Sequence, residues 1–326
     1  ISGSAGSSAR ITDGQGGPNY ANADWEIAAI RTPGVSNVLP PQIVSSFSIS
    51  DTEIEVLYSD APAAIDVANY FIVGTAGVTF ASATIDAGNT SLVHLVATAA
   101  ITADAVADTL MDDNTMSSFV LNAGITPIAF TNALNPGGTI AQDVPTTIAG
   151  LVTANDGYNN VWVNDGNGAY MGVLLFDYDF DGLVAVGDEV MFVGTLDVYN
   201  NLSELKNIEL LGIQSSDNPT FPAMISGSEI DSSLAADTNP AEQWEGQLVQ
   251  IDSATVLAYD AGTYTYELSD DAGVTKFLVG DNVDYHLGVV SLNVGTAYDI
   301  VGVVDYTSGN YRVNPRDMED VVDLSV

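Results

Sequence analysis

The sequence predicts an all-β protein in which a β-sandwich is followed by two small barrels. Short runs of alternating apolar and polar residues, separated by Gly, Asn, Asp and Ser turns, recur from residue 40 onwards. Two stretches also resemble each other, VGDEVMFVGTLDVYNN from Val186 and VGTAYDIVGVVDYTSG from Val294. Because one hydrophobic core rarely serves a chain longer than about 250–300 residues, the length of 326 residues predicts several domains.

Residues 40–135 contain the strand-like runs of the predicted sandwich. In TEIEVLYSD, the residues Ile54, Val56 and Tyr58 alternate with Glu53, Glu55 and Leu57, which predicts one buried and one mostly polar face. The Ala-rich stretch ITADAVADTLMDD, starting at residue 101, predicts a short helix or a loop that borders a strand.

The two barrels are expected at 136–235 and 236–326, because the second half of the chain repeats itself weakly. Each repeat has a Val-Gly pair, an apolar strand with an internal glycine, and a turn. A glycine within a strand marks a bulge or a tight bend, which we expect at Gly194 and Gly302. Two barrels of about five strands each account for this pattern.

Three parts of the chain resemble known families. The run from Thr146 to Leu257, with VWVNDGNGAYMGVLLF, VGDEV and WEGQLV, resembles the OB-fold domain of secreted bacterial nucleases and other cell-surface proteins. Residues 40–135 resemble a bacterial Ig-like domain, and residues 7–37, with Trp25 and RTPG, resemble the end of a lamin-tail domain. Together these resemblances imply an exported, modular surface or matrix protein.

No catalytic centre is evident in the sequence. Secreted nucleases of this kind carry a separate metal-dependent phosphodiesterase domain, and no part of this chain has that length or pattern. The two histidines, His94 and His286, fall in different predicted domains. His94 lies within SLVHLVAT and is expected to be a strand residue. We therefore expect a protein that is not an enzyme.

Acidic residues strongly outnumber basic ones, with 43 Asp and Glu against 6 Lys and Arg. Residues 32–205 contain 20 acidic residues and no Lys or Arg. Nucleic-acid binding depends on cationic side chains that displace counterions from phosphates, so we expect no binding to DNA or RNA. No stretch is long and apolar enough for a membrane span, and we expect no membrane insertion.

One motif has the spacing of a calcium-binding loop. Asp177, Asp179 and Asp181 alternate, Gly182 follows, and Asp188 occupies the twelfth position. Calcium takes six to eight oxygen ligands, and glycine permits the sharp turn that such a loop needs. The sequence thus predicts Ca²⁺ at these four aspartates, with a solvated acidic hairpin as the alternative. Thiolate metal sites are excluded, because cysteine is absent.

Aromatic residues concentrate in the predicted first barrel, at Tyr158, Trp162, Tyr170 and Tyr178. They could line a face that binds carbohydrate. Aromatic residues are also favoured in strands, so core and hairpin pairs are the other interpretation.

We expect a secreted, extracellular protein with a structural or adhesive role at a cell surface or in a biofilm matrix. The sequence starts with Ile1, and we interpret it as a processed chain or a fragment. Residues 1–39 are rich in Gly, Ser, Ala and Asn and are expected to be extended. An edge strand from ARITDG would anchor this segment on a neighbouring subunit and build a homopolymeric filament. The alternative is an accessory region of a secreted hydrolase that binds carbohydrate or another extracellular ligand.

The filament hypothesis predicts the effect of deleting residues 1–24. ISGSAGSSAR has little apolar surface to offset the entropy lost on ordering, so backbone hydrogen bonds to another subunit would have to hold it. The shortened chain should stay folded but no longer form fibres in negative-stain microscopy. Fibres that persist after the deletion contradict the hypothesis, and docking of the segment on its own subunit then becomes the better explanation.

Overall fold

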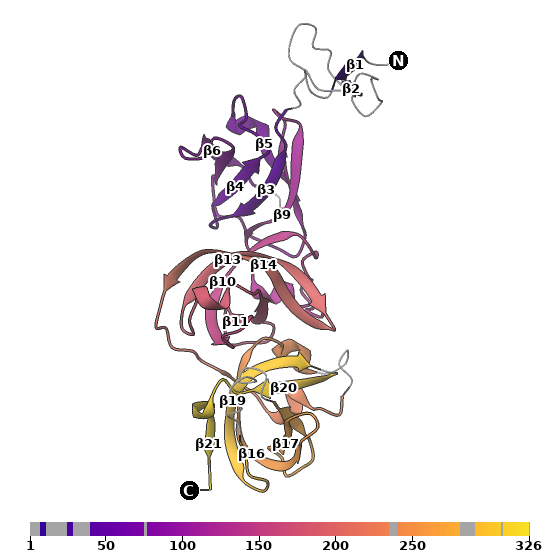
Figure 1. The fold of residues 1–326 in the computed structure, drawn as a ribbon, viewed down its shortest axis with the longest axis vertical. Coiled ribbons are helices and arrows are strands. Elements are labelled where there is room, and N and C mark those ends of the chain that lie inside the picture. Colours follow the sequence, from indigo (N-terminus) through magenta and orange to yellow (C-terminus); the bar gives the residue numbers. More distant parts are fainter. Residues whose placement is uncertain are drawn as a thin grey trace.

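Strands form nearly all of the regular structure in the computed structural model, which describes residues 7–10, 25–28, 40–74, 77–234, 240–280, 291–307 and 309–325. Helices in these ranges are short 3-10 turns, of which the longest, η7, covers Pro240–Trp244. The prediction of an all-β fold is confirmed. Figure 1 shows a sandwich and two barrels following one another along the longest axis. Within the ranges given above, no helix has the length and apolar character needed to cross a membrane.

The sandwich consists of seven strands in two sheets. One sheet has the order β3 (Ile43–Ser48), β4 (Glu53–Tyr58), β7 (Leu92–Ala97), β6 (Phe80–Ile85), and the other has β5 (Tyr70–Val73), β8 (Asp108–Asp112), β9 (Ser117–Ile125). This order is the one that describes constant-type immunoglobulin sandwiches. Both sheets contribute to one core, and the three residues predicted to face it from β4 are buried.

In the Ala-rich stretch from residue 101, residues 101–107 form the predicted loop that borders a strand, but residues 108–112 form strand β8, which was not predicted. Two of its inward-facing positions are aspartates, so the sequence of β8 does not show the alternation of apolar and polar residues that is typical of a strand. Asp112 accepts a hydrogen bond from the Tyr58 hydroxyl at 2.8 Å, and Asp108 accepts one from the Ala123 amide at 3.1 Å. These bonds allow carboxylates to occupy core positions of a strand.

The first barrel is a closed sheet of five strands: β10 (Pro145–Asn155), β11 (Asn160–Asn164), β12 (Gly172–Phe176), β13 (Glu189–Tyr199) and β14 (Leu202–Ser215). Strand β10 pairs antiparallel with both β11 and β13, while β12 runs parallel to β14, so the sheet closes on itself. Buried aliphatic and aromatic side chains from all five strands fill the interior. This is the five-stranded barrel that the sequence predicts.

The second barrel repeats these pairings with β16 (Leu248–Asp260), β17 (Thr265–Ser269), β18 (Phe277–Val279), β19 (Ala297–Thr307) and β20 (Asn310–Asn314). Strand β16 pairs with β17 and β19, and β18 runs parallel to β20. The short strands β15 (Ala223–Met224) and β21 (Val321–Asp323) extend this sheet. Strand β15 therefore belongs to the sheet of the second barrel, although it precedes residue 236.

The repeated sequence segments form equivalent strands, β13 and β19. Gly194 lies at a register shift between β13 and β14, as a bulge requires. Gly302 serves close packing instead, because a Cβ there would lie 2.6 Å from the carbonyl carbon of Asn314. The pairing of β16 with β19 is regular at Gly302.

Buried hydrogen bonds join the sandwich to the first barrel. Strand β9 pairs in parallel with β10, so the second sheet of the sandwich continues into the barrel. At this junction the Thr147 hydroxyl donates to the carbonyl of Ser48 at 2.5 Å, and the Ser48 hydroxyl accepts from the amide of Gly124 at 2.7 Å.

The two barrels meet through a small apolar cluster and a backbone contact. Ala154, Trp162 and Leu174 of the first barrel pack against Leu248 and Val303 of the second. Beside this cluster the chain at Gly172 passes so close to that at Gly246 that a Cβ on Gly172 would lie 2.3 Å from the carbonyl carbon of Gly246.

In the N-terminal 39 residues, the structure describes only the backbone of β1 (Ser7–Arg10) and β2 (Trp25–Ala28). These two strands pair antiparallel with each other. The remainder of the predicted docking segment, including most of ARITDG, lies outside the described residues.

The contact between Gly172 and Gly246 predicts that Gly172→Ala destabilises the protein. The added methyl group has to displace backbone, and overpacking of this kind costs about 1–3 kcal/mol. Urea denaturation should show a lower midpoint. Gly182→Ala is the matched control, since no atom lies within 4 Å of a Cβ built there and its midpoint should be close to that of the unmodified chain. Equal midpoints for both variants contradict the prediction.

Candidate functional site

The predicted calcium loop connects β12 to β13, and two of its four carboxylates accept hydrogen bonds from backbone amides of the loop and of β14. Asp177 accepts hydrogen bonds from the amides of Asp179, at 3.0 Å, and Ile208, at 3.2 Å. Asp188 is buried and accepts from the amide of Ala185 at 2.8 Å. These bonds hold the ends of the loop in place.

The other two aspartates of the loop are closer to solvent. Asp179 is exposed, and Asp181 is partly buried in the 3-10 turn η4 (Asp181–Leu183). Within the described part of the chain, no group of three or more Asp, Glu, His or Cys side chains is arranged to hold a metal ion. Calcium at this loop stays a prediction.

His94 is part of β7, where its ring nitrogens lie 3.4 Å from Glu53 and 3.6 Å from Asp86. It is thus a strand residue between two carboxylates. His286 lies outside the described residues.

A cleft of about 370 Å³ opens beside β11 and β12, and we call it the first-barrel cleft. OB-type barrels bind ligands on the face of their second and third strands and on the loops beside it. Most of the lining comes from these strands and from the loop 156–159, three residues come from the hairpin of β13 and β14, and two come from the second barrel. The lining residues are Asp156, Tyr158, Asn159, Asn160, Trp162, Leu174, Phe176, Tyr199, Leu202, Glu204, Asp305 and Thr307.

Two turns position the exposed aromatic residues of this cleft. The Asp156 carboxylate accepts hydrogen bonds from the amides of Tyr158, Asn159 and Asn160 at 2.9–3.0 Å, which fixes the loop that carries Tyr158. In the hairpin between β13 and β14, both Asn residues at 200 and 201 have positive φ, of 52° and 71°. This Asn-Asn turn leaves Tyr199 at its edge, and the residues Tyr158 and Tyr199 are each 61% exposed.

The floor of the first-barrel cleft is acidic. Glu204 and Asp305 are both buried. Burial raises the pKa of Glu204, and the nearby Lys206 opposes this, with its ammonium 3.8 Å from Glu204 Oε1. Lys206 also pairs with Asp197. No Lys or Arg belongs to the residues that line the cleft.

The four aromatic residues singled out in the sequence separate in the structure. Tyr158 and Trp162 line the first-barrel cleft, although the Trp162 ring is buried against the second barrel. Tyr178 stacks edge-on against Phe176, with ring centroids 5.5 Å apart, and Tyr170 donates its amide to the carbonyl of Gln243. Sequence reasoning missed Tyr199, Glu204 and Asp305. For Tyr199, the adjacent Asn-Asn pair was the one local sequence feature that indicated a hairpin turn at this position.

The second barrel has a cleft of about 270 Å³ on the equivalent face, which we call the second-barrel cleft. Asp197 pairs with Glu204 between β13 and β14, and Asp305 pairs with Arg312 between β19 and β20. Arg312 therefore stands in the second barrel where Glu204 stands in the first, and it lines the second-barrel cleft. The two clefts share a position in the fold but differ in charge.

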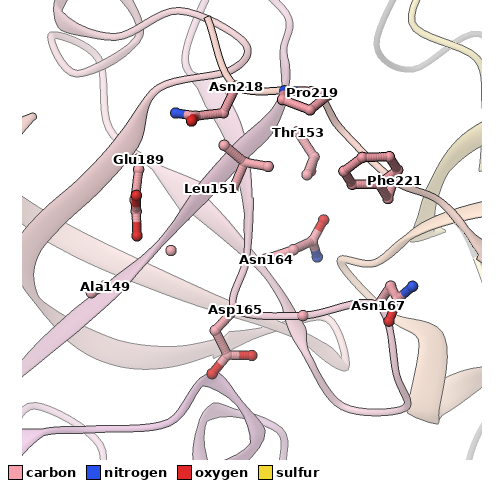
Figure 2. A pocket seen from close by; sticks show the side chains of 12 residues that line it. Ala149, Leu151, Thr153, Asn164, Asp165, Asn167, Glu189, Asn218, Pro219 and Phe221 are labelled. Atoms are coloured by element: carbon pink, nitrogen blue, oxygen red, sulfur yellow. The ribbon is translucent and has the colours of Figure 1, made fainter. Parts of the chain in front are cut away.

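A larger cavity of about 610 Å³ lies between β10, β11 and residues 218–221. Figure 2 shows Phe221 and Glu189 at opposite sides of it, with Leu151 and Asn164 between them. Two of its amide side chains have structural partners. Asn164 donates to the carbonyl of Gly246 at 3.3 Å, and Asn218 donates to that of Gly187 at 2.9 Å.

Asp165 also borders this larger cavity, and it accepts from the amide of Ile128 at 2.8 Å. Unlike the first-barrel cleft, this cavity presents one exposed aromatic ring, that of Phe221.

In comparisons with known proteins, no family model and no curated protein matches this chain.

The calcium prediction can be tested on the loop as the structure places it. Asp179→Ala removes an exposed carboxylate and leaves Asp177 and Asp188 to support the backbone. If Ca²⁺ binds the folded chain, the melting temperature should rise with Ca²⁺ and fall with a chelator, since a ligand at about 100 times its Kd adds about 2.7 kcal/mol. The variant should lose most of this effect. Sodium chloride of equal ionic strength is the control, and an equal response to both salts contradicts the prediction.

Proposed function

We infer that this chain is a noncatalytic, extracellular adhesive protein that recognises carbohydrate in the first-barrel cleft. The observation that carries this proposal is the combination of exposed Tyr158 and Tyr199 rings with amide and carboxylate groups in one concave site. A volume of about 370 Å³ lies within the range of small-molecule sites.

The chemistry of the lining suits a sugar. Aromatic rings offer flat apolar surfaces on which the C–H faces of a pyranose can pack, and a phenol hydroxyl adds a polar edge. Sugar hydroxyls are hydrogen-bond donors as well as acceptors. Carboxylates such as Glu204 accept these bonds, and the side-chain amide of Asn159 can both donate and accept.

The charge of the lining favours a neutral sugar. Asp156, Glu204 and Asp305 line the first-barrel cleft together with polar uncharged and apolar residues. Phosphate, sulfate or uronate groups would meet these carboxylates without a lining cation to compensate. The same argument supports the expectation that nucleic acid is not a ligand.

Self-assembly into a filament stays a prediction alongside this proposal. It agrees with an adhesive role, because a polymer presents many copies of one binding site and gains avidity without new contacts.

Truncation of the exposed aromatic rings tests the proposed function. Cellohexaose and maltohexaose are suitable neutral probes for titration calorimetry, after a glycan array has surveyed other sugars. Tyr199→Ala and Tyr158→Ala should each weaken binding about tenfold, since truncating an aromatic anchor costs about 1–2 kcal/mol.

The matched control is Phe71→Ala, which removes a partly exposed ring from the sandwich. It should bind as tightly as the unmodified chain. If no neutral glycan on the array binds, or if all three variants bind equally, the first-barrel cleft is not a carbohydrate site.

A further inference from the structure

Two glutamates are buried where the segment around η7 enters between the barrels. Glu242, in η7, is 7% exposed, and Glu245, just after η7, is 3% exposed. Glu245 precedes Gly246, whose backbone contacts that of Gly172 in the first barrel. Both carboxyl groups therefore lie at the junction that joins the barrels.

Glu245 contacts the strand that forms part of the first-barrel cleft. Its Oε1 atom accepts a hydrogen bond from the amide of Ser203 at 2.8 Å. Ser203 lies between Leu202 and Glu204, which both line the cleft. A residue that enters with the second barrel thus holds the first residues of β14 in place.

The other carboxyl oxygen of Glu245, Oε2, is buried and has no hydrogen-bond partner within the described chain. An ionised carboxylate would leave this oxygen without compensation in a site that excludes water, which is costly. The neutral acid carries a proton on that oxygen and avoids most of the cost. Burial above all, and then the negative charge of Glu242, raise the pKa of Glu245.

The groups around Glu245 reinforce this preference, since most of them are acidic. The Tyr311 hydroxyl, on β20, donates to Glu242 Oε2, which leaves Glu242 as an acceptor. Asp305 on β19 also raises the pKa of Glu245, and the amide of Ser203 opposes the rise. The titratable groups that face this pair of glutamates are Asp305, Tyr311 and Tyr170, and Asp305 in turn lies near Glu204 and its neighbour Lys206.

We propose that Glu245 is a positioning residue for the first-barrel cleft, and that its neutral form keeps the start of β14 in the geometry that binds ligand. Ionisation of Glu245 places a second charge beside Glu242 and loosens the junction. Affinity for a ligand of the cleft then falls as the pH rises. This last consequence rests on the proposed function, whereas the effect on β14 does not.

The direction of the pH dependence follows from the raised pKa of Glu245. A carboxyl group whose pKa is higher in the folded than in the unfolded chain contributes most below its ordinary value of 4.5. Its contribution is lost as the pH rises through the folded-state value. The junction should therefore be tightest in acid and loosest in alkaline solution.

Glu245→Gln separates charge from hydrogen bonding. The amide oxygen of Gln can still accept from the Ser203 amide, but the side chain cannot ionise. The experiment is hydrogen exchange of residues 199–205 between about pH 5 and pH 9, corrected for the intrinsic pH dependence of exchange. In the unmodified chain, corrected exchange should rise about tenfold across this range, and in Glu245→Gln it should stay constant.

Two further variants keep the test decisive. Glu242→Gln removes the neighbouring charge, so the rise in exchange should shift to lower pH, and it serves if Glu245→Gln does not fold. Glu319→Gln changes an exposed glutamate in η8 (Met318–Asp320) and should retain the profile of the unmodified chain. The proposal is overturned if corrected exchange in the unmodified chain does not change with pH. It is also overturned if Glu245→Gln shows the same pH dependence of exchange as the unmodified chain.

Cellohexaose and maltohexaose affinities, measured over the same pH range, then address the ligand. A fall of about tenfold in the unmodified chain, absent in Glu245→Gln, supports the complete proposal. If exchange responds to pH as expected but neither sugar binds, the positioning role stands and the proposed choice of ligand fails. Affinity that is independent of pH, together with pH-dependent exchange, overturns the link between Glu245 and the cleft.

Discussion

The backbone contact between Gly172 and Gly246 determines how the two barrels are joined. A Cβ at either position would overlap the backbone of the other segment, so the approach depends on the absence of both side chains. Hydrogen bonds reinforce it: Gln247 donates to the carbonyl of Gly166 at 3.0 Å, and Asn164 accepts from the amide of Leu248 at 3.4 Å. The glycine contact and these two bonds lie together where the barrels meet.

This junction explains why the first-barrel cleft has walls from two domains. The first barrel provides all of its aromatic residues, and Asp305 and Thr307 arrive on β19 of the second barrel. The junction also buries Glu242 and Glu245, which is costly for carboxyl groups. Titratable groups that are buried at a cost to stability are often functional. Here Glu245 accepts a hydrogen bond from the Ser203 amide and so holds the start of β14 beside the first-barrel cleft.

The excess of acidic residues affects the whole molecule and the choice of ligand. Among the basic residues, Lys206, Lys276 and Arg316 each form an ion pair with a neighbouring carboxylate. The fold thus uses these cations to hold its own strands and turns, and the surrounding negative potential repels polyanions. Neutral, hydroxyl-rich ligands suit such a surface better than nucleic acid does.

Local sequence determined the strands, their buried faces and the repetition of the barrel, because alternation and turn residues act over a few positions. The alternation at Ile54, Val56 and Tyr58 and the repeat at Val186 and Val294 are of this kind. The sequence failed at β8, since the carboxylates of Asp108 and Asp112 find their partners only in the folded sandwich.

The candidate site depended on tertiary structure almost entirely. Tyr158, Tyr199 and Asp305 are far apart in the chain, and closure of the first barrel and its junction with the second bring them to one cleft. The backbone amides that Asp177 and Asp188 accept from are likewise brought to them only by the fold. The sequence shows which chemical groups are present and how they are spaced. What those groups do depends on their burial and their hydrogen-bond partners, and both arise only on folding.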